Sequence, residues 1–289
     1  MRPALAVLAG WLCLGAAQAE AIRALDDGGA KLVLSATARR VVTLAPHLTE
    51  LVYAAGGAAS LVGADSASDY PSAAADLPRI GDASGLDLER IVAMRPDLVL
   101  GWLSGNKPSD IARLRQLGLP VFLSEPRRLG DVARTLRVIG LMLGSARVAE
   151  QRADAFEVRL HALRVRATRL RPVSVFFEVW HQPLITVNTD HLISDVVALC
   201  GGYNALGALP ALAPAVSLES VLAQDPEVIL AAGLPPGAMA GWSRFPGLRA
   251  VQRHQVYEID SDRVTRATPR VLDGAEQLCR LLEAARAAR

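Results

Sequence analysis

The sequence has little of several features that mark other classes of protein. Only 4% of its 289 residues are aromatic, three are cysteine, and 31 basic residues nearly balance 29 acidic ones. A chain with so small a net charge lacks the basic surface of a nucleic-acid binder, so we expect no nucleic-acid partner. Intrinsic disorder is excluded as well, because 51% of the residues are hydrophobic.

A long apolar run occurs only at the N-terminus. Arg2 precedes the run from Ala4 to Ala17, and Ala17-Gln18-Ala19 provides the small residues of a cleavage site. The run is shorter than the roughly 18–20 residues that a membrane-spanning helix needs. We therefore expect residues 1–19 to be a signal peptide cleaved after Ala19, and the mature chain to be exported to the periplasm.

The two cysteines of the mature chain are Cys200 and Cys279. Two thiols in an oxidising compartment favour one disulfide bond. The alternative is a pair of buried free thiols, which is common for this small apolar side chain.

Two pairs of similar segments occur in the same order along the chain. Residues 88–100 (LERIVAMRPDLVL) match residues 218–230 (LESVLAQDPEVIL), and residues 50–57 (ELVYAAGG) match residues 195–202 (DVVALCGG). Chance helical composition could produce one short match, but two collinear matches indicate two similar lobes.

Strand and helix signals alternate through both halves of the chain. In each longer copy, Asp87 or Ser217 can cap a helix that ends before a proline and leads into a buried strand. An Asp-Asp-Gly-Gly turn also predicts an opening β-hairpin of residues 22–25 and 31–34. The other predicted strands are 41–44, 98–100, 121–123, 173–177, 228–230 and 256–259, and the other predicted helices are 48–55, 108–117, 191–199 and 269–287. This alternation predicts an α/β fold of two Rossmann-like lobes with mainly parallel sheets.

The segment between the two halves is predicted to be one long helix. Residues 145–170 contain neither glycine nor proline, and a helix of about 25 residues would extend roughly 37 Å. Its apolar residues recur at spacings of four and three, namely Ala149, Ala153, Phe156, Leu160, Leu163 and Ala167. A surface helix within one domain is the alternative. We expect an N-terminal lobe at 20–144, a stiff linking helix at 145–170 and a C-terminal lobe at 171–289.

Ligands of open α/β sheets bind beyond the carboxyl ends of the strands, so a ligand cleft is expected between the lobes. Aromatic side chains at such positions would offer flat apolar contact to a large ligand, although each tryptophan alone could equally be part of the core. The candidate residues that follow predicted strands are His47, Tyr70, Trp102, Trp180, His181, Asp262 and Arg266.

Short motifs from Arg40 to the C-terminal helix resemble those of a known family. They are Ser68-Asp69-Tyr70-Pro71, Leu88 to Ala93, Pro96-Asp97-Leu98-Val99, Trp102 with Gly105-Asn106, Cys200-Gly201-Gly202, Ala267 to Arg270, and Gln277-Leu278-Cys279. Together they resemble the periplasmic substrate-binding proteins of ABC importers in which one long helix joins two lobes, a class that serves cobalamin, haem and siderophores. The Ser-Asp-Tyr-Pro motif and the paired cysteines are the features most specific to its cobalamin binders.

This resemblance implies a corrinoid ligand and a set of contacts to it. Tyr70 and Trp102 would pack on the corrin ring, and Asp262 and Arg266 would contact its polar periphery. The resemblance also implies a Cys200–Cys279 disulfide.

Two positions depart from the pattern of cobalamin binders. Ala83 stands where those proteins carry a stacking tryptophan, and Val179 stands where they carry a cleft phenylalanine. Either the adjacent Trp180 compensates for the missing aromatic side chains, or the ligand differs.

Members of this family dock to a permease through one glutamate on each lobe, and the matching residues are Glu89 and Glu219. Equivalent carboxylates on two similar lobes suit a permease dimer with two-fold symmetry. The alternative is local, because a glutamate in the first turn of a helix is favoured by the helix dipole.

Enzymes and metal sites are the competing classes. The chain has no glycine-rich dinucleotide loop, no Walker loop and no Gly-x-Ser-x-Gly elbow. His47-x-x-Glu50 could form a metal or acid–base pair, but Glu50 is explained more simply as a residue that stabilises a helix start. We therefore expect no enzyme.

The five histidines are scattered and form no ligand cluster, so we expect no metal site in the protein itself. His47 and His181 could face each other across the cleft, and imidazole binds transition metals. A further hypothesis is that one of them is an axial ligand to cobalt or haem iron of the bound molecule.

The sequence thus predicts an exported, monomeric binding protein that captures cobalamin, closes only slightly and delivers its ligand to an ABC import permease. No cofactor is expected besides the bound ligand. Haem or a ferric siderophore is the alternative ligand, and an exported two-lobed metal-dependent enzyme is the alternative from another class.

Overall fold

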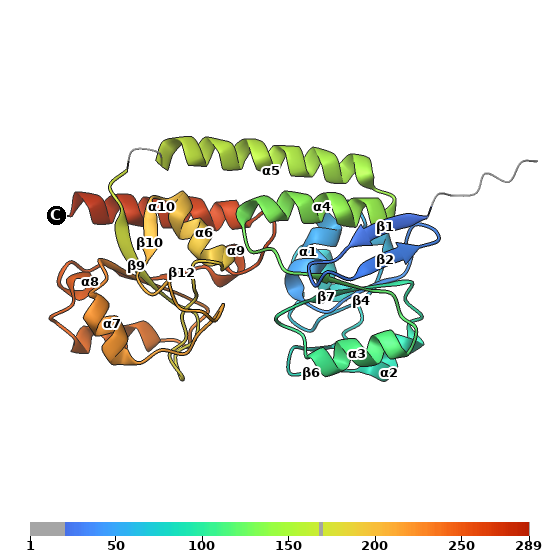
Figure 1. Ribbon diagram of the computed structural model, residues 1–289, viewed down its shortest axis with the longest axis horizontal. Coiled ribbons are helices and arrows are strands. Elements are labelled where there is room, and N and C mark those ends of the chain that lie inside the picture. The colour runs from blue at the N-terminus through green and yellow to red at the C-terminus, as the bar shows by residue number, and fades with distance from the viewer. Residues whose placement is uncertain (1–20, 168–169, 289) are drawn as a thin grey trace, which may run out of the picture.

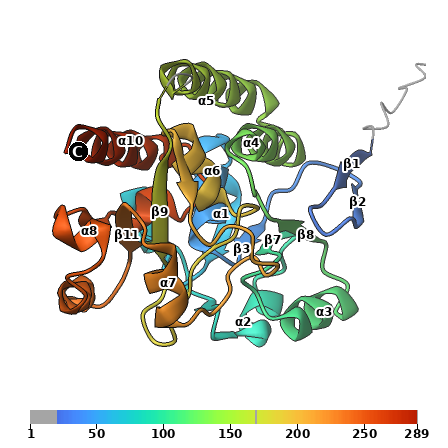
Figure 2. The same cartoon turned by 60° about the vertical axis from the view of Figure 1, so that its left-hand side comes forward.

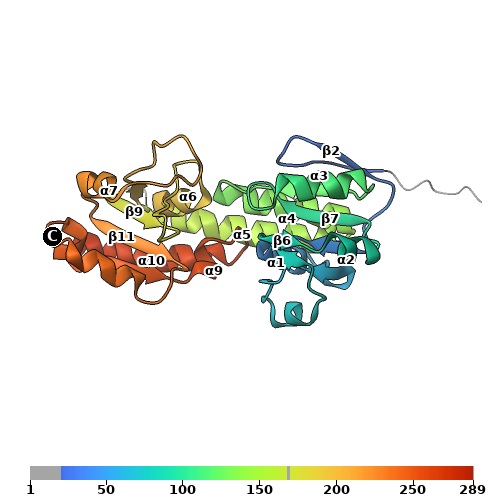
Figure 3. The same ribbon diagram turned by 90° about the horizontal axis from the view of Figure 1, so that it is seen from below.

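The computed structural model describes residues 21–167 and 170–288. Two α/β lobes lie at opposite ends of the long axis, and helix α5 runs alongside both of them (Figures 1 and 3). The expected signal peptide, residues 1–19, lies outside the described residues. Among the described residues, no helix is both long enough and apolar enough to cross a membrane.

The first lobe is built on a four-stranded parallel sheet of order β4-β3-β7-β8. It is preceded by the predicted hairpin, in which β1 pairs with β2 in antiparallel fashion, and a second, two-residue hairpin joins β5 to β6. The strands are β1 (Ile22–Leu25), β2 (Lys31–Leu34), β3 (Val41–Thr43), β4 (Leu61–Ala64), β5 (Gly81–Asp82), β6 (Gly85–Leu86), β7 (Leu98–Trp102) and β8 (Val121–Ser124).

The second lobe has a four-stranded parallel sheet of order β10-β9-β11-β12. Its strands are β9 (Val173–Glu178), β10 (Gly202–Asn204), β11 (Val228–Ala232) and β12 (Val256–Ile259). In both sheets the first strand in the sequence lies between the second and the third. The two lobes therefore share one topology, which confirms the two similar lobes predicted from the repeat.

Helices surround both sheets. In the first half of the chain they are α1 (Pro46–Ala54), α2 (Leu88–Ala93), α3 (Pro108–Gln116), α4 (Leu129–Leu143) and α5 (Ala146–Ala167), with 3₁₀ turns at Ala58–Ser60 and Ser72–Asp76. In the second half they are α6 (Leu192–Leu199), α7 (Leu218–Gln224), α8 (Arg249–Gln252), α9 (Ser261–Val264) and α10 (Val271–Ala287), with a 3₁₀ segment at Ala238–Arg244.

The sequence repeat extends to the backbone conformation of single residues. Arg95 after α2 and Asp225 after α7 have φ of 48° and 43°, and Gly56 after α1 and Gly201 after α6 have φ of 82° and 70°. These residues occupy equivalent positions of the two repeated segments. A left-handed residue stops the helix and turns the chain back toward the sheet, so the repeat preserves the turn as well as the helix.

Helix α5 packs on α4 of the first lobe and on α6 and α10 of the second. Five of the six residues of its predicted apolar face are buried, and the sixth, Ala167, is half-buried. The contact with α4 is close, because a Cβ atom on Gly140 would lie 2.2 Å from the Cβ of Ala149. Over its 22 described residues, α5 extends roughly 33 Å.

One apolar core is continuous across the molecule. A single cluster of buried side chains includes Leu100 and Phe122 of the first lobe, Phe156 of α5, and Phe177 and Leu278 of the second lobe. Smaller clusters lie on the other face of each sheet. Because the lobes share packed side chains, α5 is a rigid part of both rather than a loose tether.

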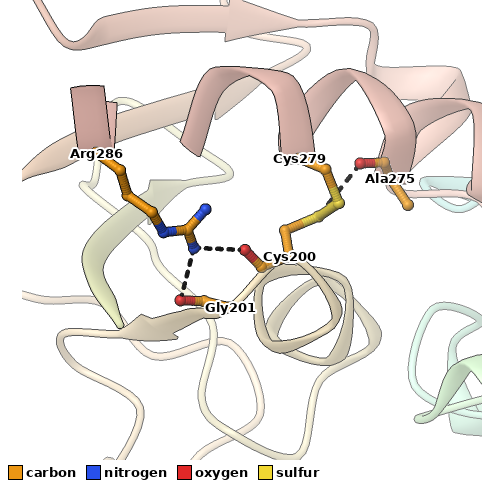
Figure 4. The surroundings of a disulfide bond; sticks show 5 residues. All are labelled: Cys200, Gly201, Ala275, Cys279 and Arg286. Carbon is orange, nitrogen blue, oxygen red and sulfur yellow. Dashed lines mark hydrogen bonds between the residues drawn. A yellow bond between two sulfur atoms is a disulfide. The ribbon is translucent and has the colours of Figure 1, made fainter. Parts of the chain in front are cut away.

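A disulfide joins Cys200, which ends α6, to Cys279 in α10 (Figure 4). Arg286 of α10 also donates hydrogen bonds to the carbonyl oxygens of Cys200 and Gly201, at 2.7 and 3.0 Å. The disulfide expected from the cysteine count and from the family resemblance is thus confirmed, and it fixes α6 to α10 within the second lobe.

Candidate functional site

A narrow cleft, with about 30 Å³ of free space, lies between the two lobes. The carboxyl ends of β7 and β8 contribute to its wall, together with the start of α1 and of α6, which confirms the predicted position of the cleft. Its lining residues are His47, Trp102, Glu125, Pro126 and Arg127 from the first lobe and His191, Leu192, Leu212, Thr265 and Ala267 from the second.

Trp102, the last residue of β7, is held by its neighbours. Asn106 is buried; its Oδ1 accepts the backbone N–H of Trp102 at 2.7 Å, and its Nδ2 donates to the carbonyl oxygen of Leu44 at 3.0 Å. The indole lies against Gly105, where a Cβ atom would be only 1.9 Å from the ring. The Trp102 and Gly105-Asn106 motif therefore acts as one unit that positions an indole at the cleft.

His47 lies in the first turn of α1, and its imidazole meets the indole of Trp102 edge to face, with ring centroids 5.4 Å apart. Its side chain is buried, and its Nε2 atom has no hydrogen-bond partner. Burial, with a smaller contribution from the positive charge of Arg266, lowers the pKa of His47 to about 4. At neutral pH this side chain is an uncharged imidazole.

A second histidine of the cleft, His191, was not among the predicted site residues. It is the N-cap of α6, and its Nδ1 accepts the backbone N–H of Ile193 at 3.1 Å. Burial, and then the charge of Arg127, lowers the pKa of His191 to about 4. The sequence repeat offered a signal for this residue. The alignment of residues 50–57 with 195–202 places residue 192 opposite His47, and His191 is its neighbour.

A buried ionic cluster connects the lobes beside the cleft. The carboxylate of Glu50, in α1, is 2.9 Å from Arg266 Nη1 and 2.6 Å from Arg270 Nη2, both in the second lobe. Arg266 also contacts Asp69 at 2.6 Å and Asp262 at 3.0 Å. The hydrogen bond from Arg266 lowers the pKa of Asp69, whereas burial raises the pKa of Asp262. Arg270 is a functional candidate that the sequence analysis missed. The explanation of Glu50 as a residue that stabilises a helix start is wrong, because it lies beyond the first turn of α1 and pairs with arginines of the other lobe.

Tyr70 belongs to the same cluster. The Arg270 guanidinium lies 3.8 Å from the centre of the tyrosine ring, in a cation–π contact. The structure thus brings Tyr70, Asp262 and Arg266 together in this cluster. None of the three lines the cleft, although Thr265 and Ala267, the neighbours of Arg266 in the sequence, do.

A second interlobe contact lies elsewhere on the same interface. Arg128, just after β8, contacts Asp190 at 3.1 Å and Asp195 at 3.9 Å, and Asp195 also accepts the backbone N–H of Leu129 at 2.8 Å. In the sequence repeat, Asp195 is the counterpart of Glu50. The two contacts are therefore equivalent. In each, an acidic residue of the helix after the first strand of one four-stranded sheet contacts an arginine that follows the last strand of the other sheet.

The structure places Trp180 and His181 apart from this group, in the turn after β9. Trp180 is 55% exposed, and its indole N–H donates to the carbonyl oxygen of Gln182. His181 Nδ1 is 2.7 Å from the buried carboxylate of Glu178. His181 lines another, more apolar pocket, with Leu184, Leu218, Gly241, Trp242, Arg244 and Phe245.

The two departures from the cobalamin-binder pattern lie in different surroundings. Ala83 is exposed in the turn between β5 and β6, and Val179 is half-buried against the main core. Neither of them lines the described cleft.

The two glutamates expected to dock to a permease occupy equivalent places. Glu89 and Glu219 are exposed in the first turns of α2 and α7. Each helix has its predicted cap, because Asp87 accepts the N–H of Arg90 and Ser217 accepts the N–H of Ser220. Figures 1 and 2 show α2 and α7 on the side of the molecule opposite α5.

Neither carboxylate oxygen of Glu50 is available to pair with His47, because both accept hydrogen bonds from arginine. Within the described residues, no group of three or more histidine, cysteine, aspartate or glutamate side chains is arranged to hold a metal ion. The arrangement instead places an indole and an imidazole of the first lobe at the cleft, with the ionic cluster of both lobes beside them.

Comparison with known proteins points to the same class. Residues 41–263 match the model of the periplasmic binding protein family. The chain is 36% identical to the vitamin B12-binding protein of Vibrio cholerae over 86% of this chain and 90% of that one. It is also 36% identical to the vitamin B12-binding protein of Yersinia pestis, over 84% of this chain and 85% of that one.

Solved structures agree with this. The periplasmic vitamin B12-binding protein of Vibrio cholerae superposes with a TM-score of 0.80 at 35% identity, covering 86% of this chain and 98% of that one. The periplasmic haem-binding protein of Roseiflexus superposes with a TM-score of 0.76 at 26% identity, covering 87% of this chain and 99% of that one. The chain belongs to the periplasmic binding protein family.

Proposed function

We propose that this protein captures cobalamin in the cleft between its lobes and delivers it to the permease of an ABC importer. The observation that carries the proposal is the cleft itself, found in a chain whose similarity to vitamin B12-binding proteins covers most of its length. Binding and release suffice for this role, so no chemical conversion of the corrinoid and no cofactor is needed. The place of action is the periplasm.

The residues at the cleft suit the two surfaces of a corrinoid. Trp102 and Tyr70 offer aromatic faces to the flat apolar ring, while Arg266 and Asp262 offer charged groups to the amides around its edge. Trp180 and His181 lie outside the cleft lining and are not among these proposed contacts.

Ligand entry requires the side chains that bridge the cleft to move aside, with only a slight parting of the lobes because they share the core along α5. The free space of about 30 Å³ is far below the roughly 300–1,000 Å³ of small-molecule pockets, and a corrinoid is larger than most drug-sized ligands. Arg266 must then exchange part of its contact with Glu50 or Asp69 for contact with the ligand. The ionic cluster therefore both holds the cleft closed and supplies contacts to the ligand.

Delivery would use the two exposed glutamates. Glu89 and Glu219 stand on equivalent helices of a monomeric chain, so together they can meet the two halves of a permease dimer. Charges at the rim of such an interface chiefly guide encounter and orientation.

Haem is the second candidate ligand. It is favoured by the cleft position of His47, whose uncharged imidazole suits iron, and by the similar fold of a haem-binding protein.

Titration calorimetry of the chain from residue 20 onward with cyanocobalamin, and separately with haemin, tests the proposal. We expect one-to-one binding of cyanocobalamin. Trp102→Ala should weaken it by about tenfold or more, because a buried aromatic contact contributes roughly 1.5–3 kcal/mol. Tyr203→Ala is the matched control, since Tyr203 is an exposed aromatic residue outside the cleft lining.

Other outcomes would contradict the proposal. Binding of haemin without cyanocobalamin would replace the ligand but keep the binding role. Recovery of a chemically altered ligand would show that the protein is an enzyme. Equal loss of affinity in both variants would place the ligand elsewhere.

A further inference from the structure

The imidazole of His47 is a buried polar group that the fold leaves unsatisfied. Its side chain is only 7% exposed, and its Nε2 atom has no hydrogen-bond partner. Leaving such a group unpaired costs roughly 1–3 kcal/mol, so native proteins rarely retain one without a use for it. Nothing in the proposed packing of Trp102 and Tyr70 on a ring requires this nitrogen.

The other two histidines considered for the site already have hydrogen-bond partners. His191 accepts a backbone N–H at Nδ1, and as a neutral ring it must therefore carry its proton on Nε2, which has no lone pair to offer. His181 is bonded to Glu178 at Nδ1 and lines a different pocket. Of the two histidines that line the cleft, only His47 has an Nε2 atom without a hydrogen-bond partner. That atom is buried in the structure, and with the ring proton on Nδ1 it would offer its lone pair to a metal once the incoming ligand uncovers it.

The surroundings of His47 favour such a bond. The edge-to-face contact with Trp102, which Gly105 and Asn106 hold in place, restricts rotation of the imidazole. A metal ligand must be deprotonated, and burial together with the charge of Arg266 keeps this ring neutral at pH 7. A flat ligand packed on Trp102 would bring its central metal close to the neighbouring imidazole.

We propose that His47 is an axial ligand to the cobalt of the bound corrinoid, replacing a water molecule on the metal. The inference rests on the proposed function. The Co–O bond to water breaks and the water leaves, while the Nε2 lone pair forms a Co–N bond. No proton is transferred, and cobalt(III) keeps its oxidation state. The site would thus select corrinoids that carry an exchangeable axial water.

The test compares two probes, aquocobalamin and cyanocobalamin, by visible spectroscopy and calorimetry at pH 7. The axial positions of cyanocobalamin are held by cyanide and by the ligand's own base, whereas aquocobalamin has one exchangeable water. We expect the main absorption band of aquocobalamin to move to longer wavelength on binding, and that of cyanocobalamin to stay in place. Aquocobalamin should also bind about tenfold more tightly or better, since even residues that only support a metal ligand change affinity 10–100-fold.

Two variants identify the ligating residue. His47→Ala should abolish both the band shift and the preference for aquocobalamin. His191→Asn keeps an N-cap side chain on α6, and its saturated complex should still show the shift. Thermal melting and circular dichroism verify that each variant is folded.

Three results would overturn the inference. One is a wild-type complex with aquocobalamin whose spectrum matches that of the free ligand, and another is a shift that persists in His47→Ala. Cyanocobalamin binding in these cases would leave the proposed function intact. If neither corrinoid binds, the proposed function fails together with the ligation.

Discussion

The two lobes share a topology, yet equivalent charged residues are buried to different extents. Glu50 of the first lobe and its repeat counterpart Asp195 each meet arginine from the opposite lobe. The Glu50 side chain is 3% exposed and that of Arg266 13%, whereas the values for Asp195 and Arg128 are 20% and 51%. The repeat determines which residues form ionic contacts across the interface. Burial determines how much each contact contributes to stability.

The lobes also differ in their covalent links. The second lobe has the disulfide between α6 and α10, whereas the first lobe, residues 20–144, contains no cysteine. The same architecture is thus stable with and without a cross-link. Four changes can test these differences.

Removal of the disulfide should have the largest effect. Cys200 and Cys279 are 79 residues apart, and in the chain-entropy description closing a loop of that length stabilises a protein by about 4 kcal/mol. We expect Cys200→Ala/Cys279→Ala to lower the free energy of unfolding by roughly that amount, as measured by urea denaturation. Hydrogen exchange should locate the loss in the second lobe. An equal increase of exchange in both lobes would contradict the assignment of the bond to one lobe.

The two cleft histidines should make stability depend on pH. Each has a pKa of about 4 in the folded protein, below the ordinary histidine value of 6.5, so the unfolded chain binds protons first as pH falls. Their contribution is fully present above pH 6.5 and decreases toward pH 4, by roughly 3 kcal/mol for each histidine.

Unfolding free energies of the wild type and of His47→Ala and His191→Asn between pH 7 and pH 4 check this expectation. Each substitution should make the decline shallower by a similar amount. An unchanged slope in either variant would show that the histidine of that lobe does not contribute.

Neutralising Glu50 should reduce the free energy of unfolding much more than neutralising Asp195. Glu50→Gln leaves Arg266 and Arg270 without their buried carboxylate, and we expect a loss of about 3 kcal/mol, the low end for a broken buried pair. Asp195→Asn should cost less than about 1 kcal/mol, because its arginine is half-exposed and screened by water. Chemical denaturation of both variants measures the difference. Similar losses would show that burial is not what separates the two contacts.

The smallest effect should come from one glycine of the first lobe. Gly105→Ala displaces the Trp102 indole, and we expect cyanocobalamin affinity to fall about tenfold, or about 1.4 kcal/mol. Gly130→Ala is the matched control, since a Cβ there meets no atom within 4 Å and lies in helix α4. That control should keep its affinity and gain up to about 1 kcal/mol of stability.

Much of the fold could be predicted from the sequence. The opening hairpin matches its predicted bounds, and the predicted strands and helices agree with the structure to within a few residues. Helix α4 was missed, although Val132, Leu136, Ile139 and Leu143 show a helical spacing. Gly130 and Gly140 weaken the helical signal there, and Gly140 is explained only by the close approach of Ala149.

The site was less accessible to sequence reasoning. Strand ends located His47 and Trp102, because topology alone brings such residues to one edge of a sheet. The pairing of Glu50 with Arg266 and Arg270 joins residues more than 200 positions apart, and local patterns carry no information on it. His47 Nε2 has no hydrogen-bond partner, whereas His191 Nδ1 accepts a backbone N–H. Such single hydrogen bonds are defined only by the three-dimensional structure.

The continuous core along α5 also has a consequence for recognition. Because packed side chains hold the lobes at a nearly fixed separation, Glu89 and Glu219 stay about equally far apart with and without ligand. A partner that contacts both carboxylates therefore receives little information from them about whether the cleft is occupied. Empty and loaded molecules should compete for the same partner, and the rate of delivery should depend on the ratio of the two forms.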